Sequence, residues 1–295
     1  MKIEKCLSYI DKYCWRCRSN GPKHDIKINI RIGSFFESMR VPLNALYYLI
    51  YNCFLNQFSI NRAYNEMVNF SNILETGTIS QHLIIKIFRE VRKAIKMFLH
   101  KKWDSSKLGM EPAENGKARI EIDESKIIAN AQSIIWMFGL IDRADKKARI
   151  FCVMKDRTRN NLLDIVKKNV YTLDPNEDDE MKTRIYSDYF SSYQVRDFYD
   201  NGYILNKVNH SVWFGQGLFH TNTVEGLWSQ IKRISHDFSG LNFKLLDEVI
   251  KDGEDAKEYI DNWICSSLFF RDCEMKKYTM QQKRDYLTNV LCIKN

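Results

Sequence analysis

The period of the hydrophobic pattern changes near residue 118, and this change limits the folds that are open to the chain. Beyond that point, short runs of β-branched and aromatic residues bounded by turns predict three strands. They cover about residues 118–123, 133–141 and 148–154. Because the connections between them are short, we expect an antiparallel meander.

Helices and strands alternate in the segment that follows. The pattern predicts a helix over 160–169, a strand over 184–188, a helix over 191–199, a strand over 203–209 and then a longer helix. This order of elements is that of an RNase H-like domain, an α/β fold with a mixed five-stranded sheet flanked by helices. In that topology the first and fourth strands are neighbours.

The last of these helices carries an unusual row of polar residues between His220 and Arg233. Read as a helix, the segment places four of them on one face, at i, i+3, i+7 and i+10: Asn222, Glu225, Ser229 and Lys232. A carboxylate beside an amide and a lysine is what a metal and phosphate site needs. In such a site Asn222 or His220 would orient the ligands.

Two further carboxylates stand at strand ends. Asp123 ends the first predicted strand and Asp188 ends the fourth. If these strands are neighbours, their ends meet, and the later helix presents Glu225 to the same point. Three such carboxylates can hold two divalent cations about 3.5–4 Å apart, an arrangement suited to phosphoryl transfer. Mg²⁺, or Mn²⁺ in its place, is the expected ion.

Each of these residues has a simpler interpretation when taken alone. An aspartate at a strand end usually belongs to a turn, His220 is more often structural than a ligand, and Trp228 is most simply a core residue. Glu124 competes with Asp123, but neighbouring strand positions point to opposite faces. Glu121 shares the face of Asp123, and we expect it to support the site.

The first 40 residues are polar and basic and contain one CxxC pair, Cys14 and Cys17. A zinc ribbon needs a second pair of ligands, and the next fifteen residues offer only His24, with Cys6 as another candidate. Two interpretations stay open: a zinc-ribbon-like segment, or a remnant that binds no metal.

Residues 41–103 predict an all-helical region, with Ser59 as the N-cap of one helix. A long amphipathic helix then begins near Ile79 and carries a basic, exposed face. Residues of that face are the candidate DNA contacts: Arg89, Arg92 and Lys93. Two helices, a turn and a basic second helix fit a helix-turn-helix module, although a plain helical bundle with a solvated basic face explains the same pattern.

The predicted domains are a zinc-ribbon-like segment (1–40), a helix-turn-helix region (41–103), a linker (104–117), an RNase H-like domain (118–240) and a helical extension (241–295). The net charge of +8 and the pI of 8.9 permit nucleic-acid binding without requiring it. The longest apolar run, about 43–55, is too short to cross a bilayer. We expect an intracellular protein, located in the nucleus of a eukaryote or in the cytoplasm and nucleoid of a bacterium.

Several motifs together resemble the Merlin superfamily of DDE transposases and related bacterial insertion-sequence transposases. These motifs are Ile30-Arg-Ile-Gly-Ser-Phe-Phe-Glu37, Glu121-Ile-Asp-Glu-Ser125, Trp136-Met-Phe-Gly139, Lys155-Asp-Arg-Thr158, Ser187-Asp188, Ser192-Tyr193, Val208-Asn-His-Ser211 and His220-Thr-Asn-Thr-Val-Glu-Gly-Leu-Trp228 with Lys232. The resemblance implies an acidic triad of Asp123, Asp188 and Glu225 and a DNA contact at Lys232. Members typically carry an N-terminal zinc ribbon, of which this chain matches only one cysteine pair.

The expected activity is therefore that of a DNA transposase. It would cut double-stranded DNA at terminal inverted repeats and join the freed 3′-hydroxyl to target DNA, as a homo-oligomer in the synaptic complex. The main alternative is a domesticated, catalytically silent DNA-binding protein of the same descent. An RNase H-type nuclease acting on RNA, or an interaction protein without a nucleic-acid role, fits the helix-turn-helix and the carboxylates less well.

Overall fold

The chain is described by a computed structural model. The described residues are 1–18, 24–71, 79–110, 118–130, 133–154, 157–172, 178–208, 220–237 and 256–292. Most of the predicted linker (111–117) and the first part of the predicted extension (241–255) lie outside them. The chain forms two compact units, one of residues Met1–Ile95 with Lys277–Asn295 and one of Lys96–Lys276.

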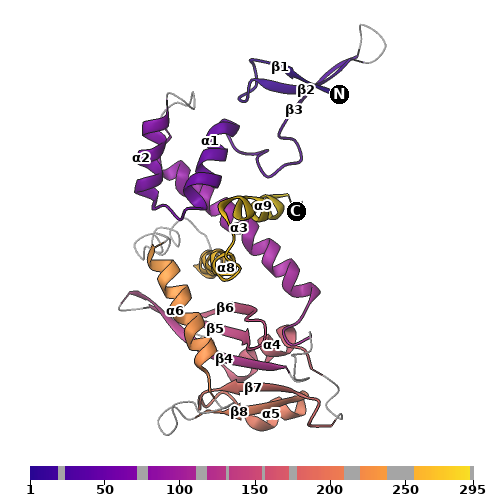
Figure 1. Cartoon of the computed structure of the whole chain (residues 1–295), viewed down its shortest axis with the longest axis vertical. Helices are drawn as coiled ribbons and strands as arrows, with labels where there is room; N and C mark the ends of the chain where they lie inside the picture. Colours follow the sequence, from indigo (N-terminus) through magenta and orange to yellow (C-terminus); the bar gives the residue numbers. More distant parts are fainter. Residues whose placement is uncertain are drawn as a thin grey trace. The chain divides into compact units, whose positions relative to one another are not determined.

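The first unit begins with a small antiparallel sheet of order β1-β2-β3 (Figure 1). Its strands are β1 (Lys2–Lys5), β2 (Tyr13–Arg18) and β3 (Asp25–Asn29). Cys14 and Cys17 both lie within β2, and Cys14 is buried whereas Cys17 is partly exposed. Residues three apart on a strand point to opposite faces, so this pair does not form a chelating knuckle. The predicted zinc-ribbon-like segment is not confirmed.

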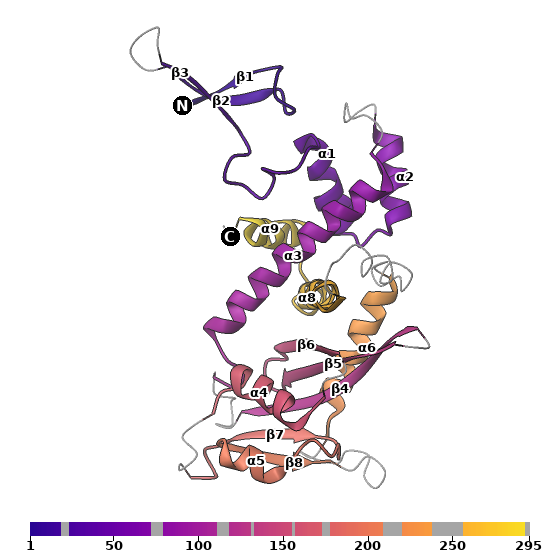
Figure 2. The same cartoon turned by 180° about the vertical axis from the view of Figure 1, so that it is seen from behind.

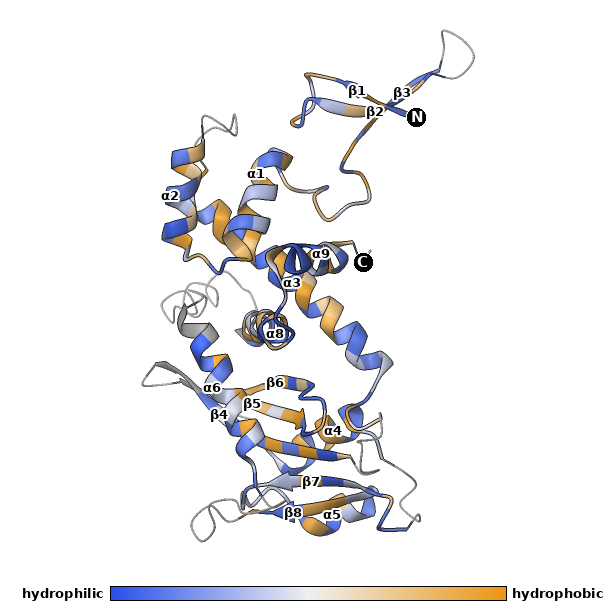
Figure 3. Cartoon of the chain, viewed as in Figure 1, coloured by the Kyte–Doolittle hydropathy of each residue, from blue (hydrophilic) through white to orange (hydrophobic). Residues whose placement is uncertain are grey.

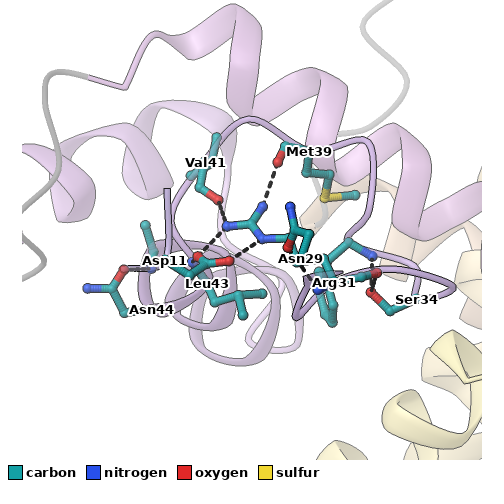
Figure 4. A network of polar contacts seen from close by, with 10 residues as sticks. Asp11, Asn29, Arg31, Ser34, Met39, Val41, Leu43 and Asn44 are labelled. Carbon is teal, nitrogen blue, oxygen red and sulfur yellow. Dashed lines mark hydrogen bonds and ion pairs between the residues drawn. The ribbon is translucent and has the colours of Figure 1, made fainter. Parts of the chain in front are cut away.

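A buried ion pair joins this sheet to the segment that follows it (Figure 4). The Arg31 side chain is 1% exposed and its Nε donates to Asp11 Oδ2 at 2.5 Å. Its other nitrogens donate to the carbonyl oxygens of Met39 and Val41, and the Leu43 amide donates to Asp11. Because these groups satisfy one another, the two charges are buried without an unpaired donor or acceptor between them.

The rest of the first unit is helical. Its helices are α1 (Leu43–Tyr47), the π-helical turn η1 (Tyr48–Phe54), α2 (Ile60–Phe70), the first part of α3 (Gln81–Ser105) and α9 (Met280–Leu291). The predicted N-cap at Ser59 is confirmed, since its hydroxyl accepts from the Arg62 amide at 3.2 Å. Phe54 and Phe88 meet edge to face in the core of this unit.

The helices α2 and α3 are present where the sequence predicts helices, but a helix-turn-helix is not confirmed. Residues 71–80 separate them, a longer connection than the three or four residues of that motif. Arg92 is only 7% exposed and its guanidinium lies 5.9 Å from the Phe54 ring, so its predicted place on the exposed face is wrong. Arg89 and Lys93, also on α3, are partly exposed.

The second unit is built on a five-stranded mixed sheet of order β6-β5-β4-β7-β8. Its strands are β4 (Arg119–Asn130), β5 (Ser133–Asp142), β6 (Ala148–Met154), β7 (Thr183–Ser187) and β8 (Tyr203–Lys207). The first three pair antiparallel, whereas β7 pairs parallel with both β4 and β8. The predicted meander and the adjacency of the first and fourth strands are confirmed. The prediction that the first strand ends at Asp123 is wrong, because β4 continues to Asn130 in its pairing with β5. The sheet order is compatible with an RNase H-like domain.

Helices cover both faces of this sheet: α4 (Arg159–Asn169), α5 (Val195–Asp200), α6 (Asn222–Asp237) and α8 (Ala256–Met275). Figures 1 and 2 show α4 and α6 on opposite faces. The core between the sheet and α4 is apolar, with Ile120, Ile122 and Phe138 packed against Leu162 and Val166. Strand β5 is mainly hydrophobic in Figure 3, whereas α6 mixes hydrophilic and hydrophobic residues, as a helix with one solvated face should.

Among the described helices, none combines the length and the apolar character that crossing a bilayer requires.

Candidate functional site

The register of the sheet brings Asp123 and Asp188 to the same level. Strands β4 and β7 run parallel, and their last paired residues are Glu121 and Tyr186. Two residues further along each strand, this register reaches Asp123 and Asp188. Strand β7 ends at Ser187, so both carboxylates lie where the two strands separate.

Three carboxyl groups converge at this point. One carboxylate oxygen from each of Asp123, Glu124 and Asp188 lies within 4.8 Å of the other two. The expectation that strand alternation removes Glu124 from the site is wrong. Glu124 does follow Ile120 and Ile122 onto the α4 face, but its side chain is long enough to reach the open edge beyond the last β4–β7 pair.

Burial and repulsion disfavour the charged forms of two members of this group, Asp123 and Glu124. Burial raises the pKa of Asp123 to about 6, and the charges of Asp188 and Glu225 raise it further, while a hydrogen bond from Trp228 lowers it. Burial likewise raises the pKa of Glu124 to about 7, with contributions from Asp123 and Asp188. The site therefore holds more negative charge than the protein around it compensates.

The donor set fits a divalent cation. Glu124 Oε1 is buried, and the neighbouring Tyr193 hydroxyl lowers the pKa of this carboxyl group. Three carboxylates and no sulfur or imidazole favour a hard ion such as Mg²⁺ or Mn²⁺. Binding such an ion would remove the repulsion among the three carboxylates.

Glu121 anchors the start of α6 rather than facing the carboxylate group directly. It is fully buried, its Oε2 accepts from the Val224 amide at 2.8 Å, and its Oε1 accepts from Arg143 Nε at 2.6 Å. His220 Nδ1 lies 3.4 Å from the same Oε1, and the His220 carbonyl oxygen accepts from Arg143. A carboxylate at a helix N-terminus satisfies a free amide and favours the helix dipole. This arrangement fixes where α6 begins and gives His220 a structural contact.

The polar face predicted for α6 is present. Asn222, Glu225, Ser229 and Lys232 are exposed, whereas its apolar residues are buried: Val224, Leu227, Trp228 and Ile231. Glu225 accepts from the Thr221 hydroxyl at 3.3 Å and lies outside the group of three, although its charge raises the pKa of Asp123. The structure therefore brings together Asp123 and Asp188, with Glu124 as their nearest acidic neighbour.

Trp228 has a second role besides filling the core. Its Nε1 donates to Asp123 Oδ2 at 2.8 Å, so the indole orients one of the converging carboxylates. The ring lies over Gly139, the β5 residue that pairs with Asp123. Sequence reasoning missed this contact, and the only signal for it is a glycine opposite an aspartate in the strand pair.

Gly139→Ala should destabilise the second unit and displace Trp228. A Cβ at this position would lie 2.6 Å from Trp228 Cη2 and 2.7 Å from Cζ2, closer than packed atoms allow. We expect a loss of about 1–3 kcal/mol in the free energy of unfolding in urea, together with weaker Mn²⁺ binding because Asp123 loses its donor.

Gly226→Ala on α6 is the matched control. A Cβ there meets nothing within 4 Å, so alanine should stabilise the helix by about 0.5–1 kcal/mol. Equal free energies of unfolding for the two variants would contradict the close packing of Trp228 on Gly139.

Comparison of the chain with protein-family models and with curated proteins found no match.

Proposed function

We propose that this protein is a DDE-type DNA transposase that cuts DNA and joins the freed 3′-hydroxyl to a target strand. The observation that carries the proposal is the convergence of the Asp123, Glu124 and Asp188 carboxylates where two parallel strands of a mixed five-stranded sheet separate. The likeness of its sequence motifs to Merlin transposases supports the same function, with double-stranded DNA as substrate and a homo-oligomer as the active form.

In this proposal Asp123 and Asp188 hold two Mg²⁺ or Mn²⁺ ions, with Glu124 or Glu225 as the third carboxylate. The bound ions would activate the attacking water or 3′-hydroxyl and stabilise the leaving oxygen. Trp228 keeps Asp123 aimed at the site by its hydrogen bond. Lys232, exposed on the same helix face as Glu225, neutralises a phosphate of the bound strand, and Asn222 supports that contact.

The test is metal-dependent nicking and joining of a labelled duplex that carries the DNA flanking the coding sequence. Wild-type protein should produce nicked and joined products with Mg²⁺ or Mn²⁺ and none with EDTA. Asp188→Asn should remove both activities because it replaces a ligand. Asp200→Asn is the matched control, since this exposed aspartate belongs to a surface ion pair with Arg196.

The third ligand is decided by two further variants in the same assay. If Glu225 completes the site, Glu225→Gln loses activity and Glu124→Gln keeps it; the reverse result assigns the role to Glu124. DNA binding without any cleavage by the wild type would support the silent, domesticated alternative, and activity of Asp188→Asn equal to wild type would refute the proposed site.

A further inference from the structure

An arginine is held between two aromatic rings beside the carboxylate group. The Arg157 guanidinium carbon lies 3.4 Å from the centroid of the Trp136 ring and 4.8 Å from that of Phe190. The Arg157 carbonyl oxygen accepts from the Ser192 hydroxyl at 3.0 Å. Both its backbone and its side chain are therefore fixed in place.

The two rings belong to the elements that build the acidic site. Trp136 lies on β5, next to β4, and Phe190 follows Asp188 by two residues. The Phe190 amide donates to Asp188 Oδ1 at 3.0 Å. The positive charge of Arg157 offsets a small part of the rise that burial causes in the pKa of Glu124. The guanidinium is thus placed against the carboxylate group by the same residues that position the carboxylates.

Within the described ranges of the chain, the contacts of the Arg157 guanidinium are with the two rings, and no carboxylate forms a salt bridge with it. The charge of Arg157 acts on Glu124, but the two side chains do not form an ion pair. Rings that stack on a guanidinium contact its faces and leave the N–H groups at its edge for recognition. A planar edge of donors matches two oxygens of a phosphate.

Two lysines add positive charge on the same side of the site. Lys126 pairs with Trp136 in the β4–β5 register, and its Nζ lies 5.0 Å from the Trp136 ring centroid. Lys207 Nζ donates to the Phe190 carbonyl oxygen at 3.4 Å. Three cations thus surround the two rings next to a group of three carboxylates. A polyanion that is bound by metal ions at the carboxylates would meet these cations at its next phosphate.

We propose that Arg157, assisted by Lys126 and Lys207, binds a backbone phosphodiester of a DNA strand next to the acidic group, on the side of Glu124. The inference rests on the proposed function, because it names how the strand to be cut is held. It assigns to Arg157 a binding and positioning role, separate from the metal ligands and from Lys232 on α6.

The test measures DNA binding without cleavage. A fluorescein-labelled duplex of random sequence is titrated in EDTA with the Asp188→Asn protein over a range of KCl concentrations. Arg157→Gln in that background should weaken DNA binding about 10-fold. It should also make the plot of the logarithm of the DNA-binding constant against the logarithm of the KCl concentration less steep, by the amount expected for the loss of about one phosphate contact. Arg157→Lys should keep the slope but bind more weakly than arginine, because lysine cannot make the paired contact.

Arg196→Gln is the matched control, because Arg196 is exposed on α5 and its ion pair with Asp200 is a surface pair. Thermal unfolding confirms that each variant is folded. If Arg157→Gln binds with the affinity and salt slope of its parent, or loses no more than Arg196→Gln, the inference is wrong. That result leaves the proposed function intact when the wild type still cuts DNA, whereas absence of cutting by the wild type would refute the proposed function itself.

Discussion

Asp123→Asn should stabilise the metal-free protein at about pH 8 while removing the metal-dependent cleavage of DNA that we propose. The wild type holds three carboxyl groups within 4.8 Å of one another, and burial, with added repulsion from Asp188 and Glu225, disfavours the charged form of Asp123. An amide of the same shape removes one charge and keeps an oxygen to accept from Trp228. Function and stability therefore oppose each other at this residue, as at many catalytic sites.

The pH dependence follows from the raised pKa values. The pKa of Asp123 is raised to about 6 and that of Glu124 to about 7, both above their values in an unfolded chain. The folded protein therefore binds these protons more tightly, and its stability falls as the pH rises from about 4 to about 7. Asparagine has no proton to lose, so the advantage of Asp123→Asn should be small near pH 4 and reach about 1–3 kcal/mol near pH 8.

Urea unfolding at several pH values measures this advantage. Adding Mn²⁺ near pH 8 should raise the free energy of unfolding of the wild type and leave Asp123→Asn almost unchanged, because ligand binding stabilises only the form that binds. Asp200→Asn should behave as wild type throughout. An Asp123→Asn protein that is less stable than wild type near pH 8 without metal would show that this carboxylate is not under repulsion.

Glu121→Ala should cause the largest loss of stability in the second unit. The Glu121 carboxylate is fully buried and holds Arg143, itself only 10% exposed at its side chain, as well as the Val224 amide at the start of α6. Alanine would remove the carboxylate opposite the buried Arg143 guanidinium, which would keep its bond to the His220 carbonyl oxygen, and would leave the helix-start amide without its acceptor. Removing one partner of a buried ion pair costs about 3–5 kcal/mol, and we expect that loss in urea unfolding.

Glu121→Gln separates the two contacts. Its amide oxygen can still accept from Val224, but the charge opposite Arg143 is gone, so the loss should be smaller than for alanine. Hydrogen exchange of the first amides of α6 should rise strongly in Glu121→Ala and less in Glu121→Gln. Unfolding free energies of both variants within about 0.5 kcal/mol of wild type would contradict the anchoring role.

The features that the sequence predicts well are those with a local cause. The strand before Asp188 is a short apolar run bounded by turns and lies where its pattern indicates, and the strand through Asp123 begins where predicted but continues to Asn130. The amphipathic division of α6 follows from the helical period alone, and the Ser59 cap from the preference of a hydroxyl for a free amide. Each of these depends on residues a few positions apart.

The errors come from contacts between distant residues. Strand alternation placed Glu124 on the other face, but the separation of β4 from β7 opens an edge that its side chain can reach. The exposed face predicted for α3 included Arg92, which packs near Phe54 instead. In each case the partner or the neighbouring strand lies far along the chain.

The sequence by itself determined the order of the strands and helices, the polar face of α6 and the candidates Asp123, Asp188 and Glu225, because period, capping and turn chemistry are encoded locally. Only the tertiary structure decided which acidic groups converge, that Trp228 orients Asp123, that Glu121 holds α6, and that Arg157 lies between two rings. Those facts depend on strand register and side-chain reach across the sheet. The physical reason is that register is set by packing of the whole sheet, which no short stretch of sequence specifies.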